Sequence, residues 1–370
     1  MSHTDVDGAV TRRAWIEAGA LVLSGLSLSA ATEAHAGTAP VRLSLNENPF
    51  GPSPHALAAI GRETAQACRY TGDEAAALER KIAAHESVSP DQIVLGEILD
   101  ALGLHLALEG GPGGEFVYSE PGYTALVDAV APGGGVVAGV PLNARLENDL
   151  TALAAKLTPR TRAVYLVNPH NPSGTVSETA DFKQIVLEAA KRTTVIVDEA
   201  YLEFEPDFAQ RSVIDLTRAG ENVVVFRTFA KIYGLAGLDI GYAVAPKPLA
   251  AALKRKGIGA PHAQNRLALA AASASLDDSG YVPLVRAKVI AEREKWGVLF
   301  DRLQLRHTDS RGNFVFFETG RPHNDVAQAM RAQGIEIARA FPPLDTWVRI
   351  AIGLPRENAL ARAAIAKLLS

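Results

Sequence analysis

The sequence is poor in cysteine, and Cys68 is the only one among 370 residues. A chain with one cysteine forms no internal disulfide, so its fold must depend on a packed core. With 48% hydrophobic residues, a chain of this length can bury a large core. Stretches rich in lysine and arginine are also missing, and the formal net charge is −4. We therefore expect no nucleic-acid partner.

Two kinds of cofactor motif are absent. No GxGxxG motif follows the first predicted strand, so a nicotinamide-dependent dehydrogenase fits poorly. No histidines and cysteines have the spacing of metal ligands, and we expect isolated histidines such as His105 and His262 to be structural. The sequence therefore predicts no bound metal.

The first 36 residues have the order of an export signal. Arg12 and Arg13 precede an apolar stretch at residues 18–31, and Ala34-His35-Ala36 has the small-x-small pattern of a cleavage site. The paired arginines are typical of the twin-arginine route. Because the apolar stretch is short and rich in serine and glycine, we expect no stable membrane span. The sequence predicts an exported, periplasmic protein. The alternative is an N-terminal tail whose two arginines are adjacent by chance.

The rest of the chain predicts an α/β fold. Residues 37–55 are polar and proline-rich, as in an extended arm. Residues 56–262 alternate helical patterns with short runs rich in valine and isoleucine, at 92–95, 115–118, 135–140, 163–167, 194–197 and 223–227. Such runs are typical of a parallel sheet buried on both faces, and they indicate a large α/β domain. Residues 263–370 predict a smaller α+β domain, in which a long helix at 283–303 precedes two strands and two helices.

Reactive side chains follow three of these strands. Asn171 follows the strand at 163–167, Asp198 and Tyr201 follow 194–197, and Lys231 follows 223–227. The carboxyl ends of parallel strands meet at one edge of a sheet, where ligands bind. A pyridine-aldehyde cofactor needs these groups: a lysine for the imine, a carboxylate for the ring nitrogen, and an amide and a phenol for the ring hydroxyl.

Five stretches carry a family resemblance, namely LNENPFGP at 45–52, NPHNPSG at 168–174, DEAY at 198–201, RTFAKIYGLAG at 227–237 and WVRIAIG at 347–353. Together they resemble the fold-type I pyridoxal-phosphate-dependent aminotransferases, specifically the histidinol-phosphate aminotransferase group. The resemblance implies a mostly parallel seven-stranded sheet between helices, with a smaller C-terminal domain. It also implies pyridoxal 5′-phosphate as cofactor, a small-molecule amino donor, a 2-oxo acid acceptor and a homodimer.

The same resemblance assigns roles to individual residues. Lys231 would form the Schiff base and would carry the proton between the substrate carbon and the cofactor. The other cofactor contacts would be Asp198 at the ring nitrogen, Asn171 and Tyr201 at the ring oxygen, Tyr123 on the ring face, Thr228 near the phosphate, and Tyr70 at the phosphate of the second subunit. Arg349 and Asn48 would bind substrate, with Arg349 taking a carboxylate as a bidentate pair.

Three departures from the family pattern concern the cofactor's phosphate. Ala230 stands in place of a serine, Asp239 stands in place of an arginine, and the turn after Gly96 is three or four residues short. A unit-charge pair at roughly 4 Å is worth about 4 kcal/mol at an effective dielectric constant near 20, so reversing one sign is costly. Two readings stay open. Either the phosphate binds weakly, or Thr228 and the helix after Gly96 hold it while Asp239 turns to solvent.

A transaminase is the first functional hypothesis. The same cofactor also supports a decarboxylase, a racemase or an oxidase, and the altered phosphate site leaves a non-catalytic binding protein open. The resemblance suggests histidinol phosphate as substrate. An exported enzyme is badly placed for a cytoplasmic histidine pathway, so we expect a different substrate. Arg339 would either favour an acidic substrate group or be a solvated loop charge.

Overall fold

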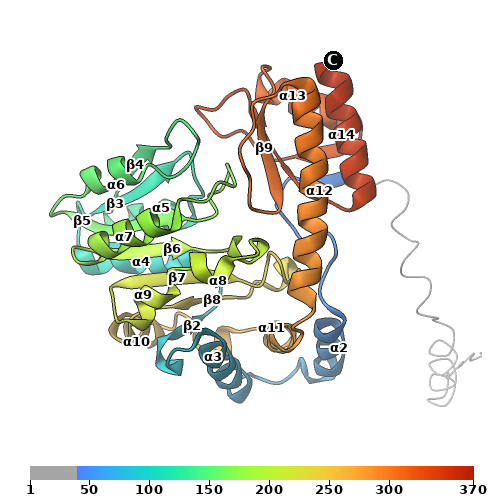
Figure 1. Cartoon of the computed structure of the whole chain (residues 1–370). Coiled ribbons are helices and arrows are strands. Elements are labelled where there is room, and N and C mark those ends of the chain that lie inside the picture. The colour runs from blue at the N-terminus through green and yellow to red at the C-terminus, as the bar shows by residue number, and fades with distance from the viewer. Residues whose placement is uncertain (1–39) are drawn as a thin grey trace, which may run out of the picture. The chain divides into compact units, whose positions relative to one another are not determined.

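A seven-stranded sheet forms the centre of the structure (Figure 1). The computed structural model describes residues 40–370, so the predicted export signal at residues 1–36 lies outside the described residues. Across the sheet the strand order is β2-β8-β7-β6-β5-β3-β4. The strands are β2 (Ile93–Leu95), β3 (Glu115–Glu120), β4 (Val136–Pro141), β5 (Thr161–Val167), β6 (Thr194–Asp198), β7 (Val223–Thr228) and β8 (Gly241–Val244). Six of the strands run in the same direction and only β8 runs in the opposite one, which confirms the mostly parallel α/β fold.

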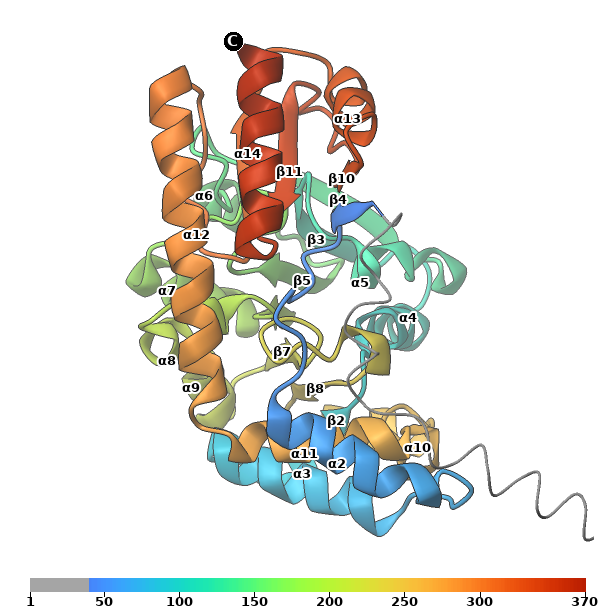
Figure 2. The same cartoon turned by 90° about the vertical axis from the view of Figure 1, so that its right-hand side faces the viewer.

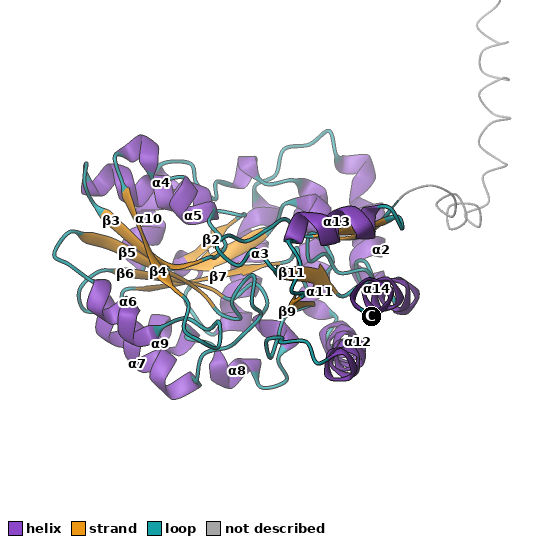
Figure 3. Ribbon diagram, turned by 90° about the horizontal axis from the view of Figure 1, so that it is seen from above, coloured by secondary structure: helices purple, strands orange, loops and turns teal. Residues whose placement is uncertain are grey.

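Helices cover both faces of this sheet. Figure 3 shows α4, α5 and α10 on one face and α6, α7 and α9 on the other. The helices of the described chain are α2 (Pro54–Glu63), α3 (Asp73–Glu86), α4 (Leu99–Gly110), α5 (Ala125–Asp128), α6 (Leu150–Lys156), α7 (Thr179–Ala190), α8 (Phe208–Arg211), α9 (Ile214–Arg218), α10 (Lys247–Arg255), α11 (Arg266–Asp277), α12 (Tyr281–Leu303), α13 (His323–Arg331) and α14 (Pro355–Leu369).

The continuous apolar strands follow from this double cover. In β6, Val195 and Val197 point into the core that contains Phe182 of α7, whereas Ile196 points into the core that contains Leu102 of α4. Successive side chains of a strand point to opposite faces, so a strand covered on both sides must be apolar at every position.

Local capping fixes where several helices begin. At α2, the Ser53 hydroxyl accepts a hydrogen bond from the Ala56 amide at 3.1 Å, and Pro54 occupies the first turn. At α11, the Asn265 side chain accepts from the Leu267 amide at 2.8 Å. Helix α11 packs against α2 and α3. It therefore lies with helices of the predicted large domain, although its residues follow the predicted boundary at 262.

The C-terminal part contains a second, smaller α+β arrangement. Strands β9 (Phe314–Glu318) and β11 (Trp347–Ala351) pair antiparallel, and α12 packs against α14. The N-terminal arm joins this part, because β1 (Val41–Leu43) pairs parallel with β10 (Ile335–Ile337) (Figure 2). The sequence predicted an extended arm but neither of these two strands. In the described part of the chain, no helix combines the length and apolar character needed to cross a membrane.

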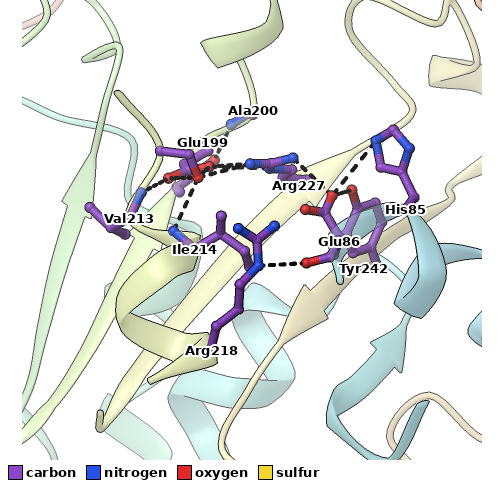
Figure 4. Close-up of polar contacts among 11 residues, drawn as sticks. His85, Glu86, Glu199, Ala200, Val213, Ile214, Arg218, Arg227 and Tyr242 are labelled. Atoms are coloured by element: carbon purple, nitrogen blue, oxygen red, sulfur yellow. Dashed lines mark hydrogen bonds and ion pairs between the residues drawn. The ribbon is translucent and has the colours of Figure 1, made fainter. Parts of the chain in front are cut away.

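A buried ion-pair network connects the sheet to the helices (Figure 4). Arg227 of β7 donates to Glu86, the last residue of α3, at 2.8 Å, and to Glu199, which follows β6, at 2.9 Å. Tyr242 of β8 donates to the same Glu86 at 2.6 Å, and Ser212 donates to Glu199. Arg227, Glu86 and Glu199 are each less than 5% exposed. The network therefore fixes the ends of two strands, β6 and β7, against each other.

Removing the cation should leave two buried carboxylates with hydrogen-bond donors but without the guanidinium that balances their charge. We expect Arg227→Met to lower the free energy of unfolding by about 3–5 kcal/mol, the usual cost of breaking a buried ion pair. Urea denaturation of both chains measures the difference. The control is Lys191→Met, which removes a surface pair with Glu188. It should cost less than about 1 kcal/mol. Equal losses in the two variants would contradict the assignment.

Candidate active site

A cavity of about 770 Å3 opens where the parallel strands end. Seven of the nine predicted site residues line it, namely Lys231, Asp198, Asn171, Tyr201, Tyr123, Thr228 and Arg349. They come from the ends of β6 and β7, from the loops that follow β3, β5, β6 and β7, and from β11. The predicted lysine and carboxylate thus face one shared space.

Asp198 is the buried acid of this cavity. Its carboxylate accepts hydrogen bonds from the Tyr165 hydroxyl at 3.0 Å and from the Ala200 amide at 2.9 Å. Burial raises the pKa of Asp198 to about 6, although these two bonds and the nearby Lys231 lower it. An acid with this pKa can share a proton with a ring nitrogen near neutral pH.

Lys231 has few competing contacts. Its ammonium lies 3.4 Å from the Leu45 carbonyl and 5.7 Å from the centre of the Tyr201 ring, and it pairs with no described carboxylate. The loop after Lys231 is held close to the arm, because a Cβ at Gly234 would collide with the Gly51 carbonyl oxygen. Gly234 also has a φ of +72°, which favours glycine. Both constraints account for Gly234, the first of the two glycines of the RTFAKIYGLAG stretch.

Arg349 lies opposite, as a buried cation. It is 7% exposed, and it donates to the Asn171 side chain at 2.5 Å and to the Ser44 carbonyl at 2.8 Å. Burial lowers its pKa to about 10, so it stays charged near neutral pH. No acidic group of residues 40–370 forms an ion pair with it, and its Nε has no partner. A buried cation without a counter-charge is costly, so an anionic ligand group would stabilise it.

The Tyr201 hydroxyl lies between two amides. Asn46 donates to it at 3.2 Å, and Asn171 lies 3.5 Å away. Sequence reasoning missed Asn46 and chose Asn48 instead. The structure places Asn48 outside the cavity lining, where its amide donates to the Ile232 carbonyl at 2.8 Å. The prediction that Asn48 binds substrate is therefore not supported by its position.

Tyr123 and Tyr70 have different surroundings. Tyr123 is 43% exposed and lines the cavity, with a pKa raised by burial and by nearby Asp198. Tyr70 is 94% exposed and does not line this cavity. Because Tyr70 does not line the cavity of its own chain, its predicted role depends on a second subunit.

The other side of the cavity is acidic. Glu97, which follows β2, accepts a short hydrogen bond from the Thr228 hydroxyl, and Thr228 accepts from the Ala230 amide at 2.8 Å. Burial raises the pKa of Glu97 to about 7. Asp239 also lines the cavity here, with a left-handed backbone (φ +50°). The sequence predicted that the turn after Gly96 is short, but not that the Glu97 side chain would lie beside Thr228 in the cavity.

These groups fit the ring of a pyridine aldehyde. A lysine and a buried carboxylate share one cavity, an amide and a phenol lie beside them, and a cation without a counter-charge faces the same space. In residues 40–370 no three histidine, cysteine or carboxylate side chains are placed to hold a metal. Fold and site together define a fold-type I enzyme that uses a lysine-bound pyridine-aldehyde cofactor.

Comparison with known proteins identifies the family. Residues 38–365 match the family model of class I and II aminotransferases. The chain is 33% identical over 330 residues to a histidinol-phosphate aminotransferase of Limosilactobacillus fermentum, covering 88% of this chain and 90% of the relative. It is 35% identical over 332 residues to histidinol-phosphate aminotransferase 2 of Pseudomonas fluorescens, covering 89% of each chain.

A solved structure supports the same assignment. The histidinol-phosphate aminotransferase of Sinorhizobium meliloti, in complex with pyridoxal 5′-phosphate, aligns with a TM-score of 0.80 and 31% identity, covering 94% of this chain and 97% of that one. The chain therefore belongs to the class I and II aminotransferase family. It is a pyridoxal-phosphate-dependent transaminase, which confirms the predicted family, cofactor and activity.

The residues fit this cofactor at one end only. Asp198, Asn171, Tyr201 and Lys231 match the needs of the ring and its aldehyde. The side that contains Glu97 and Asp239 offers two carboxylates to a phosphate dianion.

The titration of Asp198 gives a measurable pH dependence. Its pKa is about 6 in the folded chain against an ordinary value of 3.8, so the folded state holds this proton more tightly. The contribution of Asp198 to the free energy of unfolding should therefore fall as pH rises through this window and stay level above it. Asp198→Asn removes that contribution, so without cofactor the variant should gain about 3 kcal/mol relative to the parent between pH 4 and 6. Chemical denaturation across this range measures the slope. A stability difference that does not change with pH would refute the assignment.

Proposed function

We propose that this transaminase moves an amino group between an amine that carries an anionic group and a 2-oxo acid, with Lys231 as its catalytic residue. The observation that carries the proposal is Arg349, a buried cation without a described counter-charge in the cavity that Lys231 faces. Both substrates of such a reaction carry an anionic group, so one arginine serves both halves of the cycle.

Each residue then has a defined task. When bound, the cofactor supplies an aldehyde for the amino group and a ring that withdraws electrons from the substrate carbon. Asp198 would hold the ring nitrogen protonated, and Asn171 and Tyr201 would bind the ring oxygen. The Lys231 amine would capture the aldehyde and carry the proton at the substrate carbon. Asn46, which donates to Tyr201, would fix the phenol in place.

The identity of the amino donor depends on the size and charge of its anionic group. Relatives are named for histidinol phosphate, whose anionic group is a phosphate, whereas an amino acid offers a carboxylate. Arg339 also lines the cavity and lies 4.6 Å from the centre of the Phe341 ring, with Arg349 on the same ring at 5.1 Å. Two cations on one ring favour a donor with a strongly anionic or second acidic group.

Loss of the lysine amine tests the reaction itself. We expect Lys231→Ala to lose transamination and the visible absorbance of the lysine-bound cofactor, because no other described lysine lines the cavity. A screen of amino donors, including L-histidinol phosphate, with 2-oxoglutarate identifies the substrates. Turnover without any oxo-acid acceptor would instead indicate one of the alternative reactions. An unchanged absorbance band in the variant would contradict the assignment of Lys231.

Loss of the guanidinium tests substrate binding. Arg349→Gln should raise KM for both donor and oxo acid by roughly 10- to 1,000-fold, since a hydrogen bond to a charged group is worth about 1.5–3 kcal/mol and a buried charge pair somewhat more. The matched variant is Arg339→Gln. It should affect only donors with a second acidic group or a phosphate. Steady-state kinetics separate the two, and equal KM values in the Arg349 variant and the parent would exclude this role.

We also infer a homodimer and export. The nearly fully exposed ring of Tyr70 supports a dimer in which this tyrosine reaches the second subunit's site. Light scattering that gives the mass of one chain would exclude it. The paired Arg12 and Arg13 before an apolar stretch support twin-arginine export to the periplasm. Cell fractionation of a chain with both arginines changed to lysine tests this. An unchanged distribution would contradict the route.

A further inference from the structure

The chemistry of the cofactor ring defines where its phosphate must lie. In pyridoxal 5′-phosphate the aldehyde is opposite the ring nitrogen, and the ring oxygen and the phosphate arm flank the aldehyde on opposite sides. In the proposed function, on which this inference rests, Lys231 and Asp198 mark the aldehyde and the nitrogen, and Asn171 and Tyr201 mark the oxygen. The remaining side of the cavity is that of Thr228, Glu97 and Asp239, which we call the phosphate subsite.

Acceptors and negative charge dominate this subsite. Apart from Lys231, the cations that line the cavity are Arg349 and Arg339. Arg349 is bound to Asn171 on the oxygen side, and Arg339 donates to the Ala340 carbonyl beside Phe341. Within the described residues, the phosphate subsite therefore has no arginine, and two carboxylates face it.

The one hydroxyl donor of the subsite is already in use. Thr228 donates to Glu97 and accepts from the Ala230 amide, so its hydrogen is not free for a phosphate oxygen. Residue 230 is alanine and adds no hydroxyl. A phosphate can receive the Thr228 hydrogen bond only if Glu97 gives it up.

The Glu97 carboxylate has a fitted position. A Cβ at Gly241 would lie 2.8 Å from its Oε1 and 2.9 Å from the Arg227 carbonyl oxygen, so glycine at this position lets the carboxylate and the backbone pack closely. The charged and titratable groups around Glu97 are Asp198 of β6, Asp239 and Lys231 of the β7–β8 connection, and Tyr123 after β3. Burial and the two aspartates raise the pKa of Glu97, whereas Thr228 and Lys231 lower it, with a result of about 7. Its charge therefore changes near neutral pH.

We propose that Glu97 links cofactor binding to proton uptake, so that the phosphate enters its subsite when Glu97 is protonated and releases Thr228. Protonation removes one of the two negative charges that face the phosphate and turns an acceptor into a donor. Because only the protonated form accepts the phosphate, binding tightens as pH falls toward 7 and weakens about tenfold for each pH unit above it. Pyridoxal, which has no phosphate, is not subject to this linkage.

The test compares two ligands and three chains. The dissociation constants of pyridoxal 5′-phosphate and pyridoxal are measured by absorbance titration at about pH 6.5, 7.5 and 8.5, a range in which the phosphate, with a second pKa near 6, is mostly a dianion. The chains are the parent, Glu97→Gln and Glu47→Gln. Glu47 is a carboxylate of the same cavity that pairs with Arg42 and serves as the matched control. Glutamine mimics the protonated acid.

The expected result is a change in ratio rather than in one affinity. The Kd of the parent divided by that of Glu97→Gln should grow roughly twentyfold for the phosphorylated ligand between pH 6.5 and 8.5, and stay constant for pyridoxal. The ratio cancels the pH dependence of Lys231, which both chains share. Glu47→Gln should follow the parent at every pH.

A second variant keeps the test independent of folding at position 97. Asp239 is exposed and its left-handed backbone suits asparagine, so Asp239→Asn should fold. It should bind the phosphorylated ligand more tightly at about pH 6.5 and still weaken about tenfold for each pH unit at high pH, although the weakening should begin at a lower pH because Asp239 raises the pKa of Glu97.

Three outcomes overturn the inference. A constant ratio for the phosphorylated ligand excludes the linkage, while absorbance that depends on Lys231 still supports the proposed function. A ratio that changes equally for both ligands places the effect of Glu97 elsewhere than at the phosphate. Absence of cofactor binding in every chain removes the proposed function and the inference together.

Discussion

Arg227 connects the two strand ends that carry the chemistry. Its guanidinium is buried between Glu86 and Glu199. A chain neighbour of each paired residue lines the cavity, since Thr228 follows Arg227 and Asp198 precedes Glu199. A charge at this depth is tolerated only with its partners in place, so the ends of β6 and β7 cannot separate without exposing it. The relative positions of the acid and the lysine are therefore set by an interaction outside the cavity. The ends of β6 and β7 thus form the fixed base of the cavity, and its specificity depends on the loops and on the N-terminal arm.

Charge is distributed unequally across the cavity. The side with Arg349 and Arg339 is positive, and the side with Glu97 and Asp239 is negative. Lys231 lies between them. In the proposed function, an anionic substrate group would be drawn to the positive side, which would orient the substrate before any bond is made. The N-terminal arm takes part, because the Ser44 carbonyl holds Arg349 and Asn46 holds Tyr201, while β1 anchors the arm on β10. The C-terminal part thus contributes both the arginine and the strand that positions the arm beside it.

The sequence predicted the strands that are buried on both faces, because a continuous run of valine and isoleucine such as 194–197 is typical of a strand covered on both sides. It did not predict β8, β1 or β10 as strands, because each has only three or four residues. In addition, β1 and β10 are far apart in the sequence, with Val41 opposite Ile335. The reactive residues at strand ends were predicted from position and chemistry. Asn46 was missed in favour of Asn48, since LNENP offers two equivalent asparagines and only the backbone turn at Asn46, with a φ of +55°, distinguishes them. Tyr165 was missed because an aromatic residue inside a strand is indistinguishable from core until its hydroxyl is placed. Glu97 was assigned to a shortened turn, and sequence alone did not reveal that its carboxylate would fill the space beside Thr228.

The departures from the family pattern are confined to one end of the cofactor. Ala230, Asp239 and the short turn at Gly96 all lie on the phosphate side, whereas Lys231, Asp198, Asn171 and Tyr201 remain together on the ring side. A buried acid lowers the stability of the folded chain. A site that no longer bound its cofactor would not be expected to keep such an acid with its own tyrosine donor, or a lysine without an ion pair beside it. The retained half therefore argues for a functional cofactor site, and against the non-catalytic alternative. The altered half argues that the phosphate is no longer the main anchor. Glu97 supports this view, because its carboxylate takes the hydrogen bond of Thr228, the hydroxyl donor that a phosphate on this side would need.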